Sequence, residues 1–334
     1  MPTITNGGKY MQAITYTGTG STQTIAVGFQ PDFVWIKSRS AATDHKLTDS
    51  VRGVTKALIS DTTGAETTDT NGVTAFTSNG FTIGSDSVYN TNAATYVAWC
   101  WKAGGTSASN TNGSITSTVS ANTTAGFSVV TYTGTGANAT VGHGLGVAPS
   151  MIILKQRNAV DYWVVWQTAL GSTGYLLLNS TNGSSTAATY WNSTTPTSTV
   201  FSLGSDSRPN GSGTTYVAYC FAAVAGYSAF GSYTGNGSTD GPFVFTGFRP
   251  RWVLVKRSDS TGDWNLHDTS RDAYNVADKS LFPNASNAET TPYYMDILSN
   301  GFKIRDSGSS MNTSSGTYIF MALAENPFRN ALAR

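Results

Sequence analysis

The residues best suited to hold a ligand are aromatic side chains that stand close to turns. A Tyr or Trp ring offers a flat apolar face for stacking on a sugar and a polar edge for hydrogen bonds. The chain repeats itself three times, and the repeats differ most in the loops 182–195 and 283–294. Because recognition usually falls on variable loops, we expect a ligand or partner to contact Tyr190, Trp191, Tyr293 and Tyr294.

Other aromatic residues near turns could stack on a sugar in the same way. Large aromatic residues also form much of the core of a folded protein, so burial is the competing interpretation for each of them. These further candidates are Tyr89, Tyr162, Trp163 and Trp264.

A charged motif occurs twice, as LTDSVR at 47–52 and as LHDTSR at 266–271. It places an Asp three residues before an Arg, as in the pair Asp49 and Arg52. One interpretation is a polar ligand site, and the other is an ion pair that closes a loop and adds little stability if it is exposed. The middle repeat has WQTALG here and lacks both charges, so the fold does not need them. We favour the loop-closing pair.

A lysine ends the same apolar segment in every repeat, at Lys37, Lys155 and Lys256. We expect each stem to lie over apolar neighbours while its amine reaches solvent. A contact to a ligand is the alternative.

The cysteines and histidines show no pattern of a metal or catalytic site. Cys100 and Cys220 stand singly in apolar strands and read as buried structural thiols. His45, His143 and His267 have no other His, Cys or acidic residue at metal-ligand spacing, apart from directly adjacent residues such as Asp268 beside His267. Phosphate loops, nucleophile elbows and paired-carboxylate motifs are also missing from the sequence. We therefore expect a protein that is not an enzyme and that has no metal and no cofactor.

Composition excludes several classes of partner. The net charge is +1 and no basic run occurs, so we expect no nucleic-acid binding. No apolar stretch approaches the roughly 20 residues of a membrane span, so we expect no membrane insertion. The N-terminal residues do not resemble a signal peptide, which predicts synthesis and initial residence in the cytoplasm.

The segments expected to position these side chains occur three times in the sequence. Each copy contains a Tyr-Thr-Gly-x-Gly turn, a Pro-to-Lys apolar segment, a Phe-containing segment and a closing strand that begins with Thr-Tyr. A period of about 100 residues is that of whole domains, too long for one unit of a solenoid. The apolar segments are GFQPDFVWIK at 28–37, LGVAPSMIILK at 145–155 and GFRPRWVLVK at 247–256; the closing strands are TYVAWCW from Thr95, TYVAYCF from Thr215 and TYIFMAL from Thr317.

Short strand-like runs between Gly, Asn and Pro predict an all-β fold with three tandem β-sandwich domains of jelly-roll or lectin-like type. The closing strand is apolar on both faces, which predicts a central strand with Trp99 and Tyr216 buried. The segment at 104–125 is rich in Gly, Ser, Thr and Asn and predicts a linker. The expected domains are residues 1–103 (repeat 1), 126–225 (repeat 2) and 226–334 (repeat 3).

Taken together, these segments resemble a repeat-domain family of virion proteins of marine tailed bacteriophages, which are tail-fibre-like. The resemblance rests on GFQPDFVWIKSR, LTDSVRG, NGFTIGSDSVYN and TYVAWCWKAGG in repeat 1, and on GFRPRWVLVKRS, WNLHDTSRDA and GTYIFMALAENPF in repeat 3. Repeat 2 departs most, since it loses the Asp and Arg of the charged motif and the Asn-Gly before Phe201. The resemblance implies a virion component made in the host cytoplasm.

The resulting expectation is a non-enzymatic bacteriophage virion structural protein, a tail fibre or appendage that contacts the host surface. Its partners would be other virion proteins and a host surface glycan or receptor, and we expect a homo-oligomer. One alternative is a capsid or tail decoration protein that binds other virion proteins. Another is an appendage enzyme that cleaves glycans, which would need a pair of carboxylates facing one groove.

Overall fold

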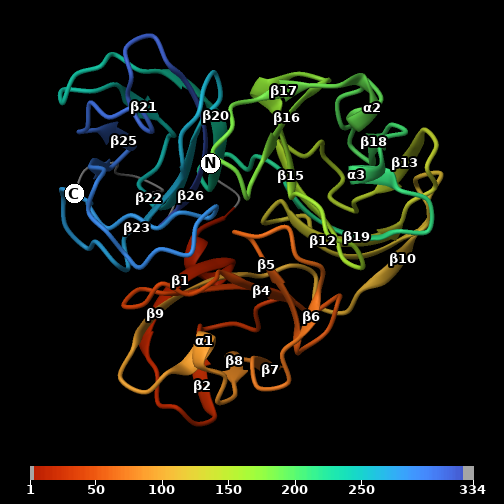
Figure 1. Ribbon diagram of the computed structural model, residues 1–334, viewed down its shortest axis with the longest axis horizontal. Helices are drawn as coiled ribbons and strands as arrows, with labels where there is room; N and C mark the ends of the chain where they lie inside the picture. Colours follow the sequence, from red (N-terminus) through yellow and green to blue (C-terminus); the bar gives the residue numbers. More distant parts are fainter. Residues whose placement is uncertain (1–3, 326–334) are drawn as a thin grey trace.

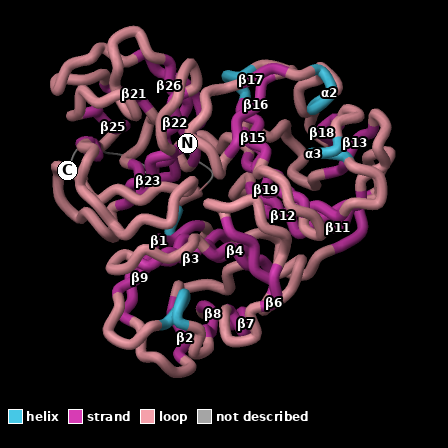
Figure 2. The backbone as a smooth tube through the Cα atoms, viewed as in Figure 1, coloured by secondary structure: helices cyan, strands magenta, loops and turns pink. Residues whose placement is uncertain are grey.

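The computed structural model describes residues 4–325, and it is all-β with several antiparallel sheets. Figure 1 shows three lobes around a common centre: repeat 1 in red and orange, repeat 2 in green and repeat 3 in blue. Figure 2 shows that helix is confined to single short turns between strands. No helix within residues 4–325 is long and apolar enough to cross a membrane.

Repeat 1 forms a six-stranded sheet of order β1-β9-β3-β4-β5-β6 and a small sheet of order β2-β8-β7. A 3-10 turn, η1 (Gly7–Lys9), precedes the first strand, and α1 lies before the closing strand. The elements are β1 (Met11–Thr17), β2 (Gln23–Ala26), β3 (Phe33–Ser38), β4 (Lys46–Asp49), β5 (Lys56–Ile59), β6 (Thr67–Thr68), β7 (Val73–Thr77), β8 (Gly80–Ile83), α1 (Ser87–Asn90) and β9 (Thr95–Trp101).

Repeat 2 follows the same plan with two strands added in front. Its long sheet has the order β10-β11-β12-β19-β14-β15-β16-β17, and its small sheet is β13-β18. The elements are β10 (Ala108–Asn110), β11 (Ser117–Asn122), β12 (Phe127–Thr133), β13 (Ala139–Gly142), β14 (Met151–Gln156), β15 (Val164–Gln167), η2 (Thr168–Leu170), β16 (Gly174–Leu177), β17 (Ser185–Thr186), α2 (Ala188–Trp191), β18 (Val200–Leu203), α3 (Ser207–Asn210) and β19 (Thr215–Phe221).

Repeat 3 has a four-stranded sheet of order β20-β26-β22-β23 and a small sheet of order β21-β25-β24. The closing strand again lies between the first strand of the repeat and the apolar strand that carries the lysine. The elements are β20 (Ser228–Thr234), β21 (Phe243–Phe245), β22 (Pro250–Arg257), β23 (Trp264–Asp268), β24 (Met295–Leu298), β25 (Gly301–Ile304) and β26 (Thr317–Ala324).

The segment 104–125 differs from the expected linker, because β10 and β11 lie within it. Strand β11 pairs with β12 and extends the long sheet of repeat 2. Residue Ile115, between the two strands, forms a parallel bridge with Val141 of the small sheet. Ser and Thr are compatible with an edge strand, and the alternating residues Ser117 and Val119 are buried. The polar segment therefore forms strands at the edge of the long sheet and not an unstructured linker.

Each closing strand in repeats 1 and 2 is buried on both faces, as its sequence predicts. In β9, Tyr96, Ala98 and Cys100 pack toward the small sheet of the same repeat. The alternate residues, among them Trp99 and Trp101, pack toward the centre of the molecule. Both faces are apolar because both are covered.

The central faces of all three repeats form one hydrophobic cluster, the central core. Phe33 of repeat 1 stacks on Tyr219 of repeat 2 with their ring centroids 4.1 Å apart. Trp101 meets Trp252 of repeat 3 edge to face at 5.6 Å. The repeats thus share a core and are not strung out as separate bodies. The central core includes Trp35, Trp99, Ile153, Tyr219, Leu254 and Met321.

Both cysteines are free and fully buried, one in each outer core. Burial in apolar surroundings raises the pKa of the Cys100 and Cys220 thiols. They act as small core residues, in agreement with the sequence.

The charged motif forms the expected loop-closing ion pair, and this pair is buried between repeats. Arg52 Nε donates to Asp49 Oδ2 at 2.5 Å, and neither side chain is exposed. The hydroxyl of Tyr219, on the closing strand of repeat 2, donates to the same carboxylate at 2.8 Å. Arg52 also contacts Glu66, which binds Arg157 of repeat 2 at 3.0 Å. The motif closes its loop and at the same time joins repeat 1 to repeat 2.

The second copy of the motif joins repeat 3 to repeat 1 in the same way. Trp99 Nε1 donates to Asp268 at 3.0 Å, and Asp268 is held by Arg271 at 2.6 Å. Arg271 contacts Glu289, which binds Arg39 of repeat 1 at 2.8 Å. The contacts therefore run from repeat 3 back to repeat 1 and close a ring.

The third interface has a neutral side chain in place of the charged motif. Gln167 stands where the other repeats have Asp, and its Nε2 donates to the carbonyl of Gly231 in repeat 3 at 3.1 Å. Equivalent backbone bonds hold all three interfaces: Glu66 N to Arg157 O at 2.7 Å, Ser184 N to Ser258 O at 2.7 Å and Glu289 N to Arg39 O at 2.9 Å. The backbone contact is thus present at every junction, whereas the Asp and Arg of the charged motif are present at only two of the three.

The three lysines are fully buried, so the expected solvent-reaching amine is also wrong. Lys155 Nζ donates to Thr63 O of repeat 1 at 3.2 Å, and Lys256 Nζ donates to Thr181 O of repeat 2 at 3.1 Å. Lys37 donates to carbonyls of its own loop. Burial lowers the pKa of each amine to about 8. Lys155 and Lys256 thus bind backbone carbonyls of the preceding repeat, whereas Lys37 binds carbonyls of its own repeat.

Truncating the buried aromatic residues of the closing strands should destabilise the whole ring. Replacing Trp99→Ala or Tyr216→Ala should lower the free energy of unfolding by about 3–5 kcal/mol, since both rings are fully buried. Tyr274→Ala is the control, because this ring is 87% exposed and its loss should change stability by less than about 0.5 kcal/mol. Chemical denaturation of the three variants measures this. Equal free energies of unfolding for Trp99→Ala and wild type would show that Trp99 does not lie in a buried core.

Burial of Lys155 predicts a specific pH dependence. Its pKa is about 8 in the folded chain against an ordinary value of 10.5. Between these values the unfolded chain binds more protons than the folded chain, so this residue's contribution to stability rises with pH. From pH 7 to 9.5 the difference in unfolding free energy, wild type minus Lys155→Met, should rise by roughly 1–2 kcal/mol. Titration of the Cys100 and Cys220 thiols affects both proteins equally, so it cancels in this difference. Parallel curves for the two proteins would contradict the buried amine.

Candidate functional site

The histidines occupy structural positions. His45 Nδ1 accepts a hydrogen bond from Trp35 Nε1 at 2.9 Å. Burial lowers the pKa of His267 to about 3, so this ring is neutral at ordinary pH. Within residues 4–325, no group of three or more His, Cys, Asp or Glu residues could hold a metal ion.

Two of the four expected contact residues lie in the core. The α2 turn directs Tyr190 and Trp191 into the outer core of repeat 2, where both are buried. Tyr190 stacks on Tyr175 with ring centroids 4.0 Å apart. Their rings are therefore covered by protein, and the expectation that they present free faces to a ligand is corrected.

The other two expected residues remain near the surface of repeat 3. Tyr293 is half-buried and meets Phe282 edge to face at 6.1 Å. Tyr294 is 39% exposed. The structure does not bring this pair together with Tyr190 and Trp191 into one site. Of the further aromatic candidates, Tyr89, Trp163 and Trp264 are buried, and Tyr162 is 37% exposed.

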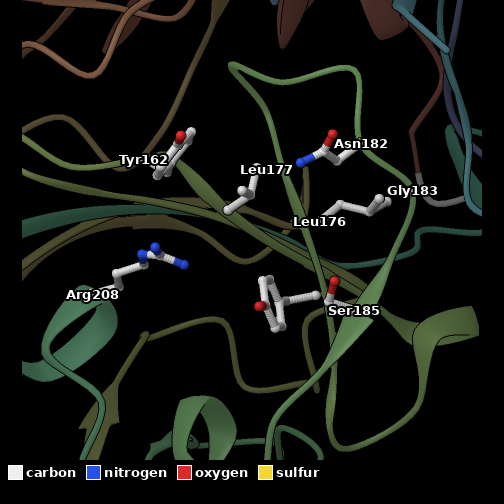
Figure 3. A pocket seen from close by; sticks show the side chains of 8 residues that line it. Tyr162, Leu176, Leu177, Asn182, Gly183, Ser185 and Arg208 are labelled. Atoms are coloured by element: carbon white, nitrogen blue, oxygen red, sulfur yellow. The ribbon is translucent and has the colours of Figure 1, made fainter. Parts of the chain in front are cut away.

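Tyr162 lines a pocket of about 240 Å³ in repeat 2 (Figure 3). The residue lies two positions before the start of β15, and the neighbouring strands β16 and β17 supply the floor and one rim. Arg208 reaches in from the α3 turn, and its backbone N–H is capped by the Asp206 side chain. The lining residues are Tyr162, Tyr175, Leu176, Leu177, Asn182, Gly183, Ser185 and Arg208.

Three contacts fix the guanidinium of Arg208 at the pocket. Its Nη1 donates to the Tyr190 hydroxyl at 2.6 Å, and its Nε donates to Asp161 Oδ1 at 3.1 Å. The group also lies over the ring of Tyr162, 5.2 Å from the ring centroid. Its Nη2 has no hydrogen bond to any residue in the range 4–325. One oriented donor is therefore left for a ligand.

The opposite rim carries two more unused polar groups. The side-chain amide of Asn182 and the hydroxyl of Ser185 form no hydrogen bond within the described part of the chain. Figure 3 shows Asn182 and Ser185 on the far side of the pocket from Arg208. Such groups, set around aromatic faces, are what a small polar ligand requires.

Both rims are anchored on the neighbouring repeats. Asp161 N donates to Thr63 O of repeat 1 at 3.0 Å, and Gly262 N of repeat 3 donates to Thr181 O at 2.9 Å. Gly183 has no side chain where the loop passes Ser260, since a Cβ would lie 3.0 Å from its backbone. The ring of repeats therefore holds the pocket in shape before any ligand arrives.

Repeat 1 fills the corresponding place with its own side chains. Strand register equates Lys46 with Val164, because Lys46 pairs with Ile36 as Val164 pairs with Leu154. Lys46 Nζ binds Asp69 at 2.9 Å, and the Tyr89 hydroxyl donates to the same carboxylate at 2.9 Å. The polar groups of Lys46, Asp69 and Tyr89 thus bind one another. Repeat 2 has lost the lysine, and its polar groups face an open pocket.

Sequence reasoning found Tyr162 but missed Arg208 and Tyr175. The signal for Arg208 was the change from SDSVYN in repeat 1 to SDSRPN in repeat 2. An arginine at this otherwise matching position has no counterpart in repeats 1 and 3, where Val88 and Ser310 stand.

The comparisons with known proteins add a family but no activity. A family model described as a domain of unknown function, DUF7483, matches residues 6–327 and so spans all three repeats. A search of curated proteins finds no match to the chain. The family description states no ligand or partner, so a function has to be argued from the pocket and the surface.

Proposed function

The chain belongs to the DUF7483 family, and we propose that it is a non-enzymatic structural protein of a bacteriophage virion that binds a surface sugar in the repeat 2 pocket. The virion assignment rests on the resemblance of its repeats to tail-fibre-like proteins. The sugar assignment rests on the pocket, which combines two aromatic residues with one arginine, one amide and one hydroxyl.

The pocket carries the proposal because its chemistry matches one sugar ring. Its volume of about 240 Å³ is below the roughly 300–1,000 Å³ of sites that take drug-sized molecules. Tyr162 and Tyr175 offer apolar surface for a ring face. Arg208 Nη2, Asn182 and Ser185 can each bond a hydroxyl group.

The charges favour a neutral sugar. Asp161 binds Arg208 at 3.1 Å and balances its charge, so the pocket offers a directed donor without excess positive potential. An acidic sugar would place its carboxylate close to that of Asp161. We therefore propose a neutral hexose unit of a larger glycan.

Binding is proposed rather than cleavage. Hydrolysis of a glycosidic bond needs two carboxyl groups on either side of the bond. No acidic residue lines the pocket within the described range, and the nearby Asp161 is engaged by Arg208. The position of the protein on the virion depends on where its glycan and protein partners lie. It is either a tail fibre or appendage that contacts the host, or a decoration of the capsid or tail.

The pocket makes a prediction that separates it from the loop 283–294. Tyr162→Ala should weaken binding to a neutral oligosaccharide about 5- to 30-fold, or about 1–2 kcal/mol, because it removes one stacking face. Tyr294→Ala is a matched control, since the two rings are 37% and 39% exposed. The measurement is binding of labelled protein to an array of neutral and uronic-acid oligosaccharides. Loss of binding in Tyr294→Ala alone would move the site to the loop 283–294. Preference for uronic acids would refute the neutral ligand.

The virion assignment is tested by location. Gold-labelled antibody against this chain should mark the tail or its appendages in electron micrographs of virions that contain it. Label on the head would favour the decoration protein. Absence of the protein from purified virions would refute the virion assignment.

A further inference from the structure

We propose that the edge strand β21 of repeat 3 is a docking site for an extended, apolar strand of a partner polypeptide, which lies parallel to it. This site is on a different repeat from the sugar pocket, and it does not depend on sugar binding. The inference comes from comparing the same edge strand in the three repeats.

Strand register makes the three edge strands directly comparable. Ile25 of β2 pairs with Phe81, Val141 of β13 pairs with Phe201, and Val244 of β21 pairs with Phe302. The flanking positions therefore correspond: Thr24, Thr140 and Phe243 before the paired residue, and Ala26, Gly142 and Phe245 after it. Only repeat 3 has large apolar residues there.

Repeat 2 shows how this edge is covered. The chain's own segment 113–117 runs beside β13, with Ile115 in a parallel bridge to Val141. Ile115 N donates to Thr140 O at 2.9 Å, and Ser117 Oγ donates to Gly142 O at 2.8 Å. Ile115 is buried by this contact. The fold thus accepts an added parallel strand at this edge, using the carbonyls that flank the paired residue.

The same carbonyls are open in repeat 3. Thr246 N donates to Asn300 O, and Ile304 N donates to Pro242 O. Hydrogen-bonded pairs alternate in an antiparallel ladder, so Phe243 and Phe245 direct their backbone groups away from β25. Within residues 4–325 no other segment bridges to β21. The opposite edge of this small sheet is covered, since Ala277 bridges to Met295 of β24.

The side chains of this open edge are apolar and exposed. Phe243 is 45% exposed and Phe245 is 66% exposed. Open apolar edges promote unwanted pairing, and folded β-proteins commonly protect them with charge, proline or a covering segment. Repeat 1 has Thr24 and Ala26 at these positions and so has no such patch. The two rings are therefore explained by a strand that covers them.

The surroundings define the partner's chemistry. Lys303 is paired with Asp240 at 2.7 Å, and Arg305 is paired with Asp296 at 2.6 Å. The flanks thus carry balanced charge and select no charged segment. The partner strand resembles residues 113–117, with apolar side chains in place of Ser114 and Thr116, which flank Ile115 on the opposite face. Strand addition of this kind draws affinity from main-chain bonds and specificity from alternate side chains.

The test uses a labelled peptide of residues 112–118 carrying Ser114→Val and Thr116→Val. Fluorescence anisotropy should show saturable binding to the full chain. The double variant Phe243→Thr/Phe245→Ala, which has the residues of repeat 1, should bind at least tenfold more weakly. Tyr274→Ala is the control with an exposed ring outside β21 and should bind like wild type. The peptide without the valines should bind more weakly than the peptide with them.

Results of three kinds would overturn the proposal. The first is the absence of saturable binding, or equal binding by wild type and the double variant when both melt alike. The second is a wild-type dimer in sedimentation that the double variant lacks, which would show that β21 pairs with a second copy. The third is tighter peptide binding by a variant that ends at residue 325, which would show that the chain's own last residues occupy the edge.

Discussion

The structure depends on the burial of both faces of the closing strands β9, β19 and β26. One face of β9 and β19 covers the small sheet of its own repeat, and the other enters the central core shared by all three. A strand that is apolar on both faces cannot leave either face in water without losing a large part of the hydrophobic stabilisation. The three repeats therefore stabilise one another.

Sharing a core forces polar groups into the junctions. The Asp and Arg of the charged motif lie where one repeat meets the next, and so do Lys155 and Lys256 with their carbonyl partners. A buried ion pair is weak evidence for stability, because desolvation offsets its attraction. The junction that has Gln167 in place of the charged motif agrees with this. The charged pairs instead help to orient neighbouring repeats. Tyr219 donates to Asp49, and Trp99, at the same position of its own closing strand, donates to Asp268.

Because the inner faces are constrained, the repeats have diverged on their outer parts. Repeat 2 has opened a pocket where repeat 1 has the network of Lys46, Asp69 and Tyr89. Repeat 3 has placed Phe243 and Phe245 on an edge that repeat 2 covers with its own chain. One scaffold thus presents a polar pocket on one repeat and an apolar edge on another. The two proposed binding functions thus rest on local sites that a common fold carries.

The sequence by itself determined the repeats, the apolar strands and the burial of the large apolar residues in the closing strands. The run TYVAWCW is apolar on both faces and so predicts burial of both, and Trp99 and Tyr216 are buried. Only the tertiary structure decided what lies against those faces. The partners of Asp49 and Asp268 come from other repeats, the α2 turn carries Trp191 inward, and Arg208 meets Tyr162 across the fold. The physical reason is that local periodicity records whether a side chain leaves water, whereas its partner depends on how distant sheets pack.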